Sequence, residues 1–158
     1  MSPPFIYLVE KGVVLINHQK LGKWVAPGGH VELNEMPHET AIREAKEETG
    51  LDIQLLDMDP LKINDQNATT IPSPYMMMLH PVNFPCPHEH VNFVYLAKAL
   101  HPFLKGNEES SGIKWFLPLE IKKLSDKEIF EDTTKTLNHL FSLDLFPLAY
   151  KFDTMNPL

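Results

Sequence analysis

The stretch from Gly29 to Leu51, GHVELNEMPHETAIREAKEETGL, decides the fold of this chain. Three of its glutamates, Glu44, Glu47 and Glu48, stand at positions i, i+3 and i+4. On a helix with about 3.6 residues per turn, side chains at this spacing share one face of roughly 100°. We therefore predict a helix from about residue 37 to residue 49 with an acidic face near its C-terminal end.

The acidic face of this predicted helix is electrostatically unfavourable by itself. Pro37 suits the first turn of the helix and Gly50 suits its C-terminal cap, so the carboxylates lie at the negative end of the helix dipole. Like charges at these spacings destabilise a helix by about 0.2 to 0.5 kcal/mol per pair. A divalent cation would remove both penalties, because carboxylate oxygens are the ligands that Mg²⁺ and Mn²⁺ prefer. A solvated acidic face is the alternative, and it is the commoner fate of an isolated EAKEE segment.

The residues around the acidic face favour the metal site. They match the pattern G-x5-E-x7-R-E-U-x-E-E-x-G-U, where U is aliphatic, at all nine fixed positions, which are Gly29, Glu35, Arg43, Glu44, Ala45, Glu47, Glu48, Gly50 and Leu51. Chance agreement at the seven invariant letters is of order one in a billion at a given start. On these residues the sequence resembles the Nudix hydrolases.

The resemblance extends outward from this pattern. It includes Trp24–Gly29, WVAPGG, and more weakly Ile113–Phe116, IKWF, and we expect it to cover residues 4 to about 143. It implies the Nudix fold, an α/β architecture in which a mixed β-sheet is sandwiched between helices (an α/β/α sandwich). With 158 residues and 43% hydrophobic residues, the chain has the length of one such domain. We expect residues 1–158 to form a single domain that ends in an irregular tail.

Composition excludes several classes of partner. The formal net charge of −7 argues against general binding to a nucleic-acid backbone, and bound metal must supply the attraction for a polyanionic substrate. The apolar run Phe5–Val9 is too short for a signal peptide or a membrane span. Cys86 is the only cysteine, so no disulfide forms within the chain, and we expect a reducing, cytoplasmic location.

Hydrophobic periodicity predicts the remaining elements. We expect strands at Phe5–Val9, Val13–Ile16, Trp24–Ala26, Leu51–Leu56, Tyr75–His80, Val91–Leu100 and Gly112–Phe116. Glu10-Lys11-Gly12 is typical of a hairpin turn between the first two strands. Ser125 and Glu128 have the spacing of a capping box, which predicts a second helix from about 126 to 142. The first helix is expected to pack through His38, Ala41, Ile42, Ala45 and Thr49.

The acidic face suggests a mechanism. Hydrolysis of a phosphoanhydride needs neutralised phosphate charge and an activated water, and bound divalent metals can supply both. Our hypothesis is that Glu44, Glu47 and Glu48 hold one to three Mg²⁺ ions, with Mn²⁺ as a substitute, and that a backbone carbonyl at Gly28 or Gly29 completes the shell. Glu44 or Glu47 also orients or deprotonates the attacking water, and the sequence does not decide which of the two glutamates has this role.

Other polar residues have weaker signals. The resemblance implies that Arg43 pairs with Glu35 to fix the loop against the helix, and Glu32 in that loop is either a ligand or solvated. A further acidic ligand from a later loop is expected at Glu108 or Glu109, and Glu89 is the next candidate. His88 and His90 have an H-x-H spacing but lack a third dependable zinc ligand, so they either approach the substrate or cap the strand.

The resemblance implies hydrolysis of a nucleoside diphosphate linked to a further group. We expect a nucleoside triphosphate to be cleaved to monophosphate and pyrophosphate; ADP-ribose or a sugar nucleotide, and an inactive nucleotide-sensing module, are the alternatives. Asn67 stands where dinucleoside polyphosphate hydrolases would carry a tyrosine. Phe84, Phe93 and Tyr95 either stack on a base or belong to the core. The expected partner is a small-molecule nucleotide derivative, and we expect no binding to membranes or nucleic acids. The sequence leaves open whether the protein forms a homodimer.

Overall fold

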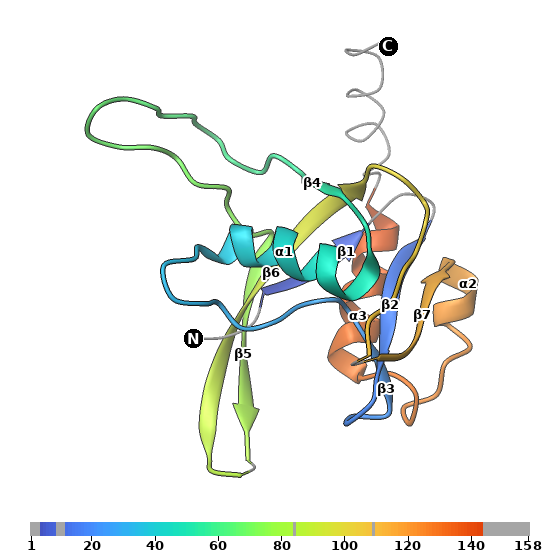
Figure 1. Ribbon diagram of the computed structural model, residues 1–158. Helices are drawn as coiled ribbons and strands as arrows, with labels where there is room; N and C mark the ends of the chain where they lie inside the picture. Colours follow the sequence, from blue (N-terminus) through green and yellow to red (C-terminus); the bar gives the residue numbers. More distant parts are fainter. Residues whose placement is uncertain (1–3, 9–11, 84, 109, 144–158) are drawn as a thin grey trace.

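The computed structural model of the protein describes residues 4–8, 12–83, 85–108 and 110–143. The elements follow in the order β1 (Pro4–Leu8), β2 (Val13–His18), β3 (Lys23–Val25), α1 (Pro37–Thr49), β4 (Ile53–Leu55), β5 (Met76–Val82), β6 (His88–Ala99), β7 (Ser110–Phe116), α2 (Pro118–Ile121) and α3 (Glu131–Ser142), as labelled in Figure 1. None of the helices in this described part of the chain combines the length and apolar character needed to cross a membrane.

The strands form two sheets. In the larger, mixed sheet β6 pairs in parallel with β1, and antiparallel with β5 and with β4. The smaller sheet is antiparallel and has the order β3-β2-β7. The long strand β6 therefore organises the larger sheet, because β1, β4 and β5 all bond to it.

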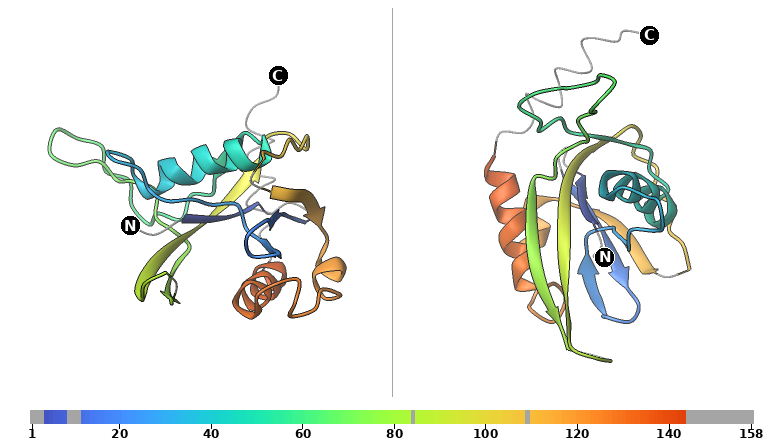
Figure 2. Two further views of the ribbon diagram at one scale, coloured as in Figure 1. Left: turned by 60° about the horizontal axis from the view of Figure 1, so that its bottom comes forward. Right: turned by 90° about the vertical axis from the view of Figure 1, so that its left-hand side faces the viewer.

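Helices α1 and α3 lie on opposite faces of the strands, as both views of Figure 2 show. Alternating side chains of β2 reach the two sides: Val13 and Leu15 join the core cluster that contains Leu137 and Leu140 of α3, and Val14 joins the cluster that contains Ala41 of α1. This is the period of two that a strand buried on both faces requires. The α/β/α prediction is confirmed.

Helix α1 spans the predicted residues and has the predicted cap. Gly50 adopts the left-handed conformation with φ of 73°, and its N–H donates to the Lys46 carbonyl at 2.9 Å. Ala41, Ala45 and Thr49 are buried as expected, but Ile42 is 42% exposed, so its assignment to the packing side was wrong. The buried side of α1 instead lies closer to the acidic face and includes Thr40 and Glu48.

Two predictions based on local signals were wrong. The strands around the expected hairpin turn belong to different sheets, β1 with β6 and β2 with β3 and β7; Glu10 and Lys11 themselves lie outside the described residues. Only half of the predicted Ser125–Glu128 capping box is present: the Glu128 carboxylate accepts the Ser125 N–H and hydroxyl, whereas the Glu128 N–H donates to the Ser125 carbonyl, and the contacts close a single turn. A bridge between Trp24 and Ile129 holds the chain extended after that turn, so α3 begins only at Glu131.

The other predicted strands are present with shifted ends. β4 is shorter than expected, whereas β5 and β6 run on past their predicted limits until Val82 pairs with His88. Helix α2 was not predicted, because its four residues are too few to show a helical period. The expected irregular tail lies outside the described residues.

Gly50→Ala should lower the free energy of unfolding by more than Gly22→Ala. Both glycines have positive φ, so each alanine incurs about 1 kcal/mol or more of backbone strain. At Gly50 an added Cβ would also lie 2.8 Å from Lys105 Cβ, whereas nothing lies within 4 Å at Gly22. Urea denaturation of the two variants measures the difference, and equal losses would contradict this account of the cap.

Candidate functional site

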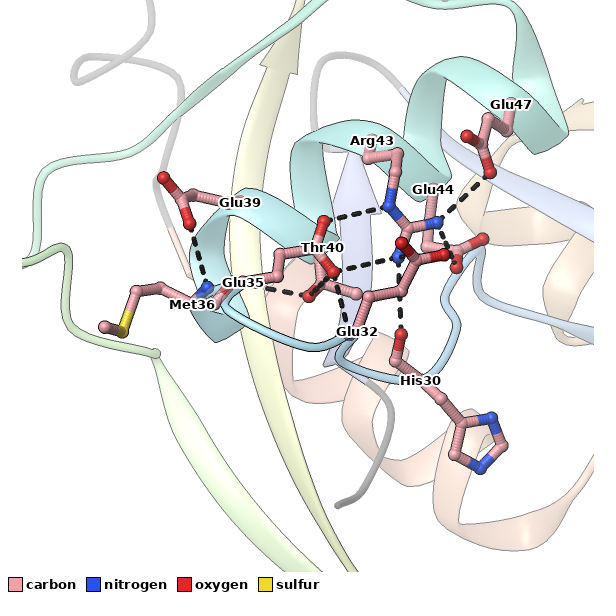
Figure 3. Close-up of polar contacts among 9 residues, drawn as sticks. All are labelled: His30, Glu32, Glu35, Met36, Glu39, Thr40, Arg43, Glu44 and Glu47. Carbon is pink, nitrogen blue, oxygen red and sulfur yellow. Dashed lines mark hydrogen bonds and ion pairs between the residues drawn. The ribbon is translucent and has the colours of Figure 1, made fainter.

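Arg43 on α1 links the helix to the loop that precedes it (Figure 3). Its Nε and Nη2 donate to the two carboxylate oxygens of Glu35 at 2.8 and 3.0 Å, and Nη2 also donates to the His30 carbonyl at 3.3 Å. A planar guanidinium that binds both oxygens of one carboxylate is fixed in orientation as well as in position. The predicted contact between Arg43 and Glu35 is therefore present.

Glu35 gathers further donors from the same region. The Thr40 hydroxyl donates to it at 2.6 Å and the Glu32 N–H at 3.1 Å. The Arg43 hydrogen bond, helped by Thr40 and Glu32 and opposed by burial, lowers the pKa of Glu35 to about 2, and Glu35 in turn raises the pKa of Arg43. This ionised pair fastens the loop to α1.

The three glutamates of the acidic face have different surroundings. Glu48 is 7% exposed and accepts the Gly28 N–H at 2.8 Å. The Glu44 carboxylate lies against Gly29, in space that a Cβ on that residue would occupy. The Glu47 side chain is 56% exposed and accepts from Arg43 Nη1 at 3.1 Å. The structure therefore brings Glu44 and Glu48 to the glycine loop and turns Glu47 toward Arg43.

Glu44 and Glu48 also line a cavity of about 920 Å³. Gly28, Gly29 and His30 continue its wall on the loop side. The wall also includes residues from β5, β6 and the start of α3, namely Met78, His80, His90, Asn92, Phe130 and Asp132. A volume of this size, with mixed apolar and polar walls, is typical of a small-molecule site.

This donor set fits a hard divalent cation. The Glu44 and Glu48 carboxylates face a loop whose glycines leave room for them, and such oxygens are the ligands that Mg²⁺ prefers. Glu47 is not part of the cavity wall, although Arg43 Nη1 links it to Glu44 by donating to both, at 3.1 and 2.8 Å. Among the described residues, no three His, Cys, Asp or Glu side chains form a ready-made metal cluster.

The structure does not bring most of the other acidic candidates to the cavity. Glu32 lines it, with a side chain that is 71% exposed. Glu89 and Glu108 are exposed and are not part of the cavity wall, and Glu109 lies outside the described residues. Neither Glu89 nor Glu108 therefore joins Glu44 and Glu48 on the cavity wall.

Of the H-x-H pair, only His90 lines the cavity. Its Nε2 lies 2.9 Å from the Nε2 of His88, and its ring packs edge to face on His30 with centroids 5.4 Å apart. Burial, with smaller effects from the neighbouring imidazoles, lowers the pKa of His90. This lowered pKa keeps His90 neutral over a wider pH range, and its ring forms part of the cavity wall.

Sequence reasoning missed Asn92, His80 and Asp132 as cavity residues. For Asn92 the one available signal was the period of two along β6, which carries it to the same face as His90. The same period sends Tyr95 to the core on the α1 side, where Phe93 packs as well, so neither stacks in the cavity; burial raises the pKa of Tyr95 to about 12. Phe84 lies outside the described residues.

Comparison with known proteins identifies the family. The NUDIX domain family matches residues 5–137, most of the chain, and this protein belongs to it. Among solved structures, a NUDIX family hydrolase from Clostridium perfringens is 28% identical, covers 89% of this chain and 95% of its own, and has a TM-score of 0.72. A C. elegans Ap4A hydrolase, 16% identical over 89% of this chain and 95% of its own, has a TM-score of 0.66 and shares the fold.

Among curated relatives, a probable DHNTP pyrophosphohydrolase from Lactococcus lactis is 32% identical over 96 residues, which are 61% of this chain and 52% of that protein. The chain thus spans about half the length of this relative. It spans smaller shares of other curated matches, 25% in the case of an uncharacterised Nudix hydrolase from Bacillus subtilis. Family membership is therefore established, whereas the substrate is a matter of proposal.

Glu35→Gln should lower the free energy of unfolding by about 2 kcal/mol at pH 7, because it removes the charge that Arg43 binds. The folded-state pKa of Glu35, about 2, lies below its ordinary value of 4.5. Its contribution is therefore complete above about pH 4.5 and is lost as the pH falls toward 2. Denaturation of both proteins at pH 7, 4 and 2.5 should show that their difference in free energy of unfolding becomes smaller as the pH falls. Glu89→Gln, at an exposed site, is the control. A difference in free energy of unfolding between wild type and Glu35→Gln that stays constant with pH would contradict the assignment of this stability to ionised Glu35.

Proposed function

We propose that this protein hydrolyses a phosphoanhydride bond in a nucleoside diphosphate linked to a further group, with Mg²⁺ as its cofactor. The leading substrate class is a nucleoside triphosphate, cleaved to monophosphate and pyrophosphate. The observation that carries the proposal is the carboxylate pair, Glu44 and Glu48, which faces the Gly28–Gly29 loop on the wall of a cavity of about 920 Å³.

In this proposal Glu44, Glu47 and Glu48 hold the metal, with a carbonyl of Gly28 or Gly29, and Mn²⁺ can replace Mg²⁺. When bound, the metal supplies neutralisation of phosphate charge and activation of the attacking water. Glu44 or Glu47 orients this water or takes up its proton. Glu44 is better placed for that task, since it lines the cavity and the exposed Glu47 does not.

Arg43 and Glu35 act by positioning. Arg43 Nη1 touches both Glu44 and Glu47, and its other two nitrogens are held by Glu35. Removing Glu35 would therefore release Arg43 and change the position of the two acidic groups that it contacts. Neither residue needs to touch the substrate for this effect.

The name of the L. lactis relative, a probable DHNTP pyrophosphohydrolase, supports cleavage of a triphosphate with release of pyrophosphate, although DHNTP itself is a pterin triphosphate. ADP-ribose or a sugar nucleotide is the alternative substrate. An inactive nucleotide-sensing module is the other alternative, but such a module has no need for the carboxylates Glu44 and Glu48 beside the glycine loop. A small-molecule partner and a reducing, cytoplasmic location suit the acidic chain and its single, exposed Cys86.

The decisive experiment is an assay of nucleoside triphosphates, ADP-ribose, dinucleotides and sugar nucleotides with Mg²⁺. We expect turnover of a triphosphate with release of pyrophosphate, abolished by EDTA and restored by added Mg²⁺. Glu48→Gln should lower kcat about a hundredfold, because it removes a charged ligand from the buried end of the pair.

Glu39→Gln is the matched control for this assay. It lies on the same helix, and a glutamine there can still accept the Met36 N–H that Glu39 now accepts at 2.8 Å. Turnover that withstands EDTA, or an equal loss in Glu39→Gln and Glu48→Gln, would refute the proposed site. The absence of turnover on every phosphoanhydride in the panel would favour the sensing module.

Gly29→Ala should lower activity far more than stability. The added Cβ would overlap the Glu44 carboxylate, which lies at the end of a flexible side chain and can swing away at a cost within about 1 kcal/mol. A displaced carboxylate should reduce kcat/KM by about a hundredfold. Gly112→Ala is the control, because its Cβ would meet its nearest neighbour, in Trp24, at an ordinary 3.5 Å. Full activity in Gly29→Ala would show that the position of Glu44 is unimportant.

A further inference from the structure

Strand β5 forms an open edge of the larger sheet. Met76–Val82 pairs with β6, and among the described residues no other strand pairs with it. The right-hand view of Figure 2 shows β5 on the outer side of β6. An edge strand presents N–H and C=O groups that a further extended chain can bind. β5 is therefore a place where another strand can continue the sheet.

The direction of the backbone along β6 shows which residues of β5 point to this open edge. β4 and β5 pair with β6 on the side away from β1, and there the Leu96 carbonyl accepts the Leu56 N–H at 2.8 Å. Backbone direction alternates along a strand, so Val94 also points to its partner on β5, which points back. The alternate residues of β5, Met77 and Leu79, therefore direct their N–H and C=O groups away from β6.

The side chains along this edge are apolar and exposed. Met77 and Leu79 are 63% and 58% exposed, and Val91, the β6 partner of Leu79, is also exposed on that face. Natural edge strands are commonly protected by short length or by charged side chains. β3 and β4 have three residues each and β7 carries Lys114, whereas the seven residues Met76–Val82 include no Asp, Glu, Lys or Arg. β5 therefore lacks both of these protections.

A second copy of this chain fits the open edge better than a charged partner does. The net charge of −7 makes two copies repel each other, and this repulsion is weakest where two uncharged segments meet. Strands that pair antiparallel with their own copies around a twofold axis are self-complementary, as a closed dimer requires. An acidic or basic peptide would find no lysine, arginine or carboxylate on β5. The uncharged edge therefore favours another β5 as its partner.

We propose that two copies of the protein associate through their β5 strands and join their larger sheets into one. With the twofold axis at Met78, Met77 of each copy pairs with Leu79 of the other, and the outward N–H and C=O groups of these residues bond across the axis. The exposed side chains of both residues then cover one another on a single face. This register keeps Pro81, which has no N–H to donate, outside the central pairs.

The mass of the protein in solution tests the association. A single pair of edge strands is a small interface, so we expect a reversible dimer with a dissociation constant of about 1 to 100 µM. Sedimentation equilibrium of the full chain should show an average mass that rises with concentration from 18.1 kDa towards twice that value. A mass that stays at 18.1 kDa up to about 500 µM would overturn the proposal. Because no hydrolysis is measured, such a failure leaves the proposed function untouched.

Leu79→Lys should raise the dissociation constant of the dimer about a hundredfold, because both copies lose an apolar side chain from the interface and gain a charge. Leu119→Lys is the matched control, since Leu119 is also exposed but lies on α2 rather than on a strand. The control should leave the dissociation constant unchanged, and urea denaturation should show that both variants are folded. An equal effect of the two substitutions, or no effect of Leu79→Lys, would refute the role of β5.

A disulfide between the copies tests the register. In a Cys86→Ser background, which removes the one natural thiol, Met78→Cys places a thiol from each copy at a pair that is not hydrogen-bonded. The Cα atoms of such a pair lie about 4.5 Å apart, within reach of a disulfide. Diamide should therefore oxidise the thiols to a covalent dimer that dithiothreitol reduces. Met76→Cys is the control, because the stagger sets its Cα atoms about 13 Å apart. Cross-linking at Met76→Cys but not at Met78→Cys would overturn the register.

Discussion

The ion pair between Arg43 and Glu35 is the constraint on which the rest of the site depends. Both Glu35 oxygens accept from Arg43, at 2.8 and 3.0 Å, while the third guanidinium nitrogen touches Glu44 and Glu47. Since the guanidinium is planar, binding two of its nitrogens fixes the direction of the third. One side chain thereby holds the loop against α1 and orders two carboxylates of the acidic face.

The cavity beside the held loop has two chemically different groups of residues on its wall. Where Gly28 and Gly29 meet Glu48 and Glu44, hard oxygen donors gather. Residues of β5, β6 and α3 add an amide, imidazoles and a carboxylate to the same wall, beside apolar side chains. Membership of the NUDIX domain family agrees with the first group.

Local signals in the sequence succeeded where the structure itself is local. Helix α1 and its Gly50 cap follow from residues within a few positions of one another, and both were predicted correctly. The hairpin between the first two strands failed because β1 finds its partner in β6, about 90 residues along the chain. The start of α3 failed because the bridge from Trp24 to Ile129, which no local pattern encodes, keeps the preceding residues extended.

The sequence by itself determined the family, the α/β/α class, the acidic helix and the pairing of Arg43 with Glu35, because each is encoded at short spacing or in one contiguous pattern. Only the tertiary structure decided that Glu44 and Glu48 share a cavity while Glu47 turns to Arg43. It alone placed Asn92 on the wall of the same cavity. The physical reason is that burial and pairing of a polar atom depend on which distant strands and helices pack around it, and residue spacing along the chain does not contain that information.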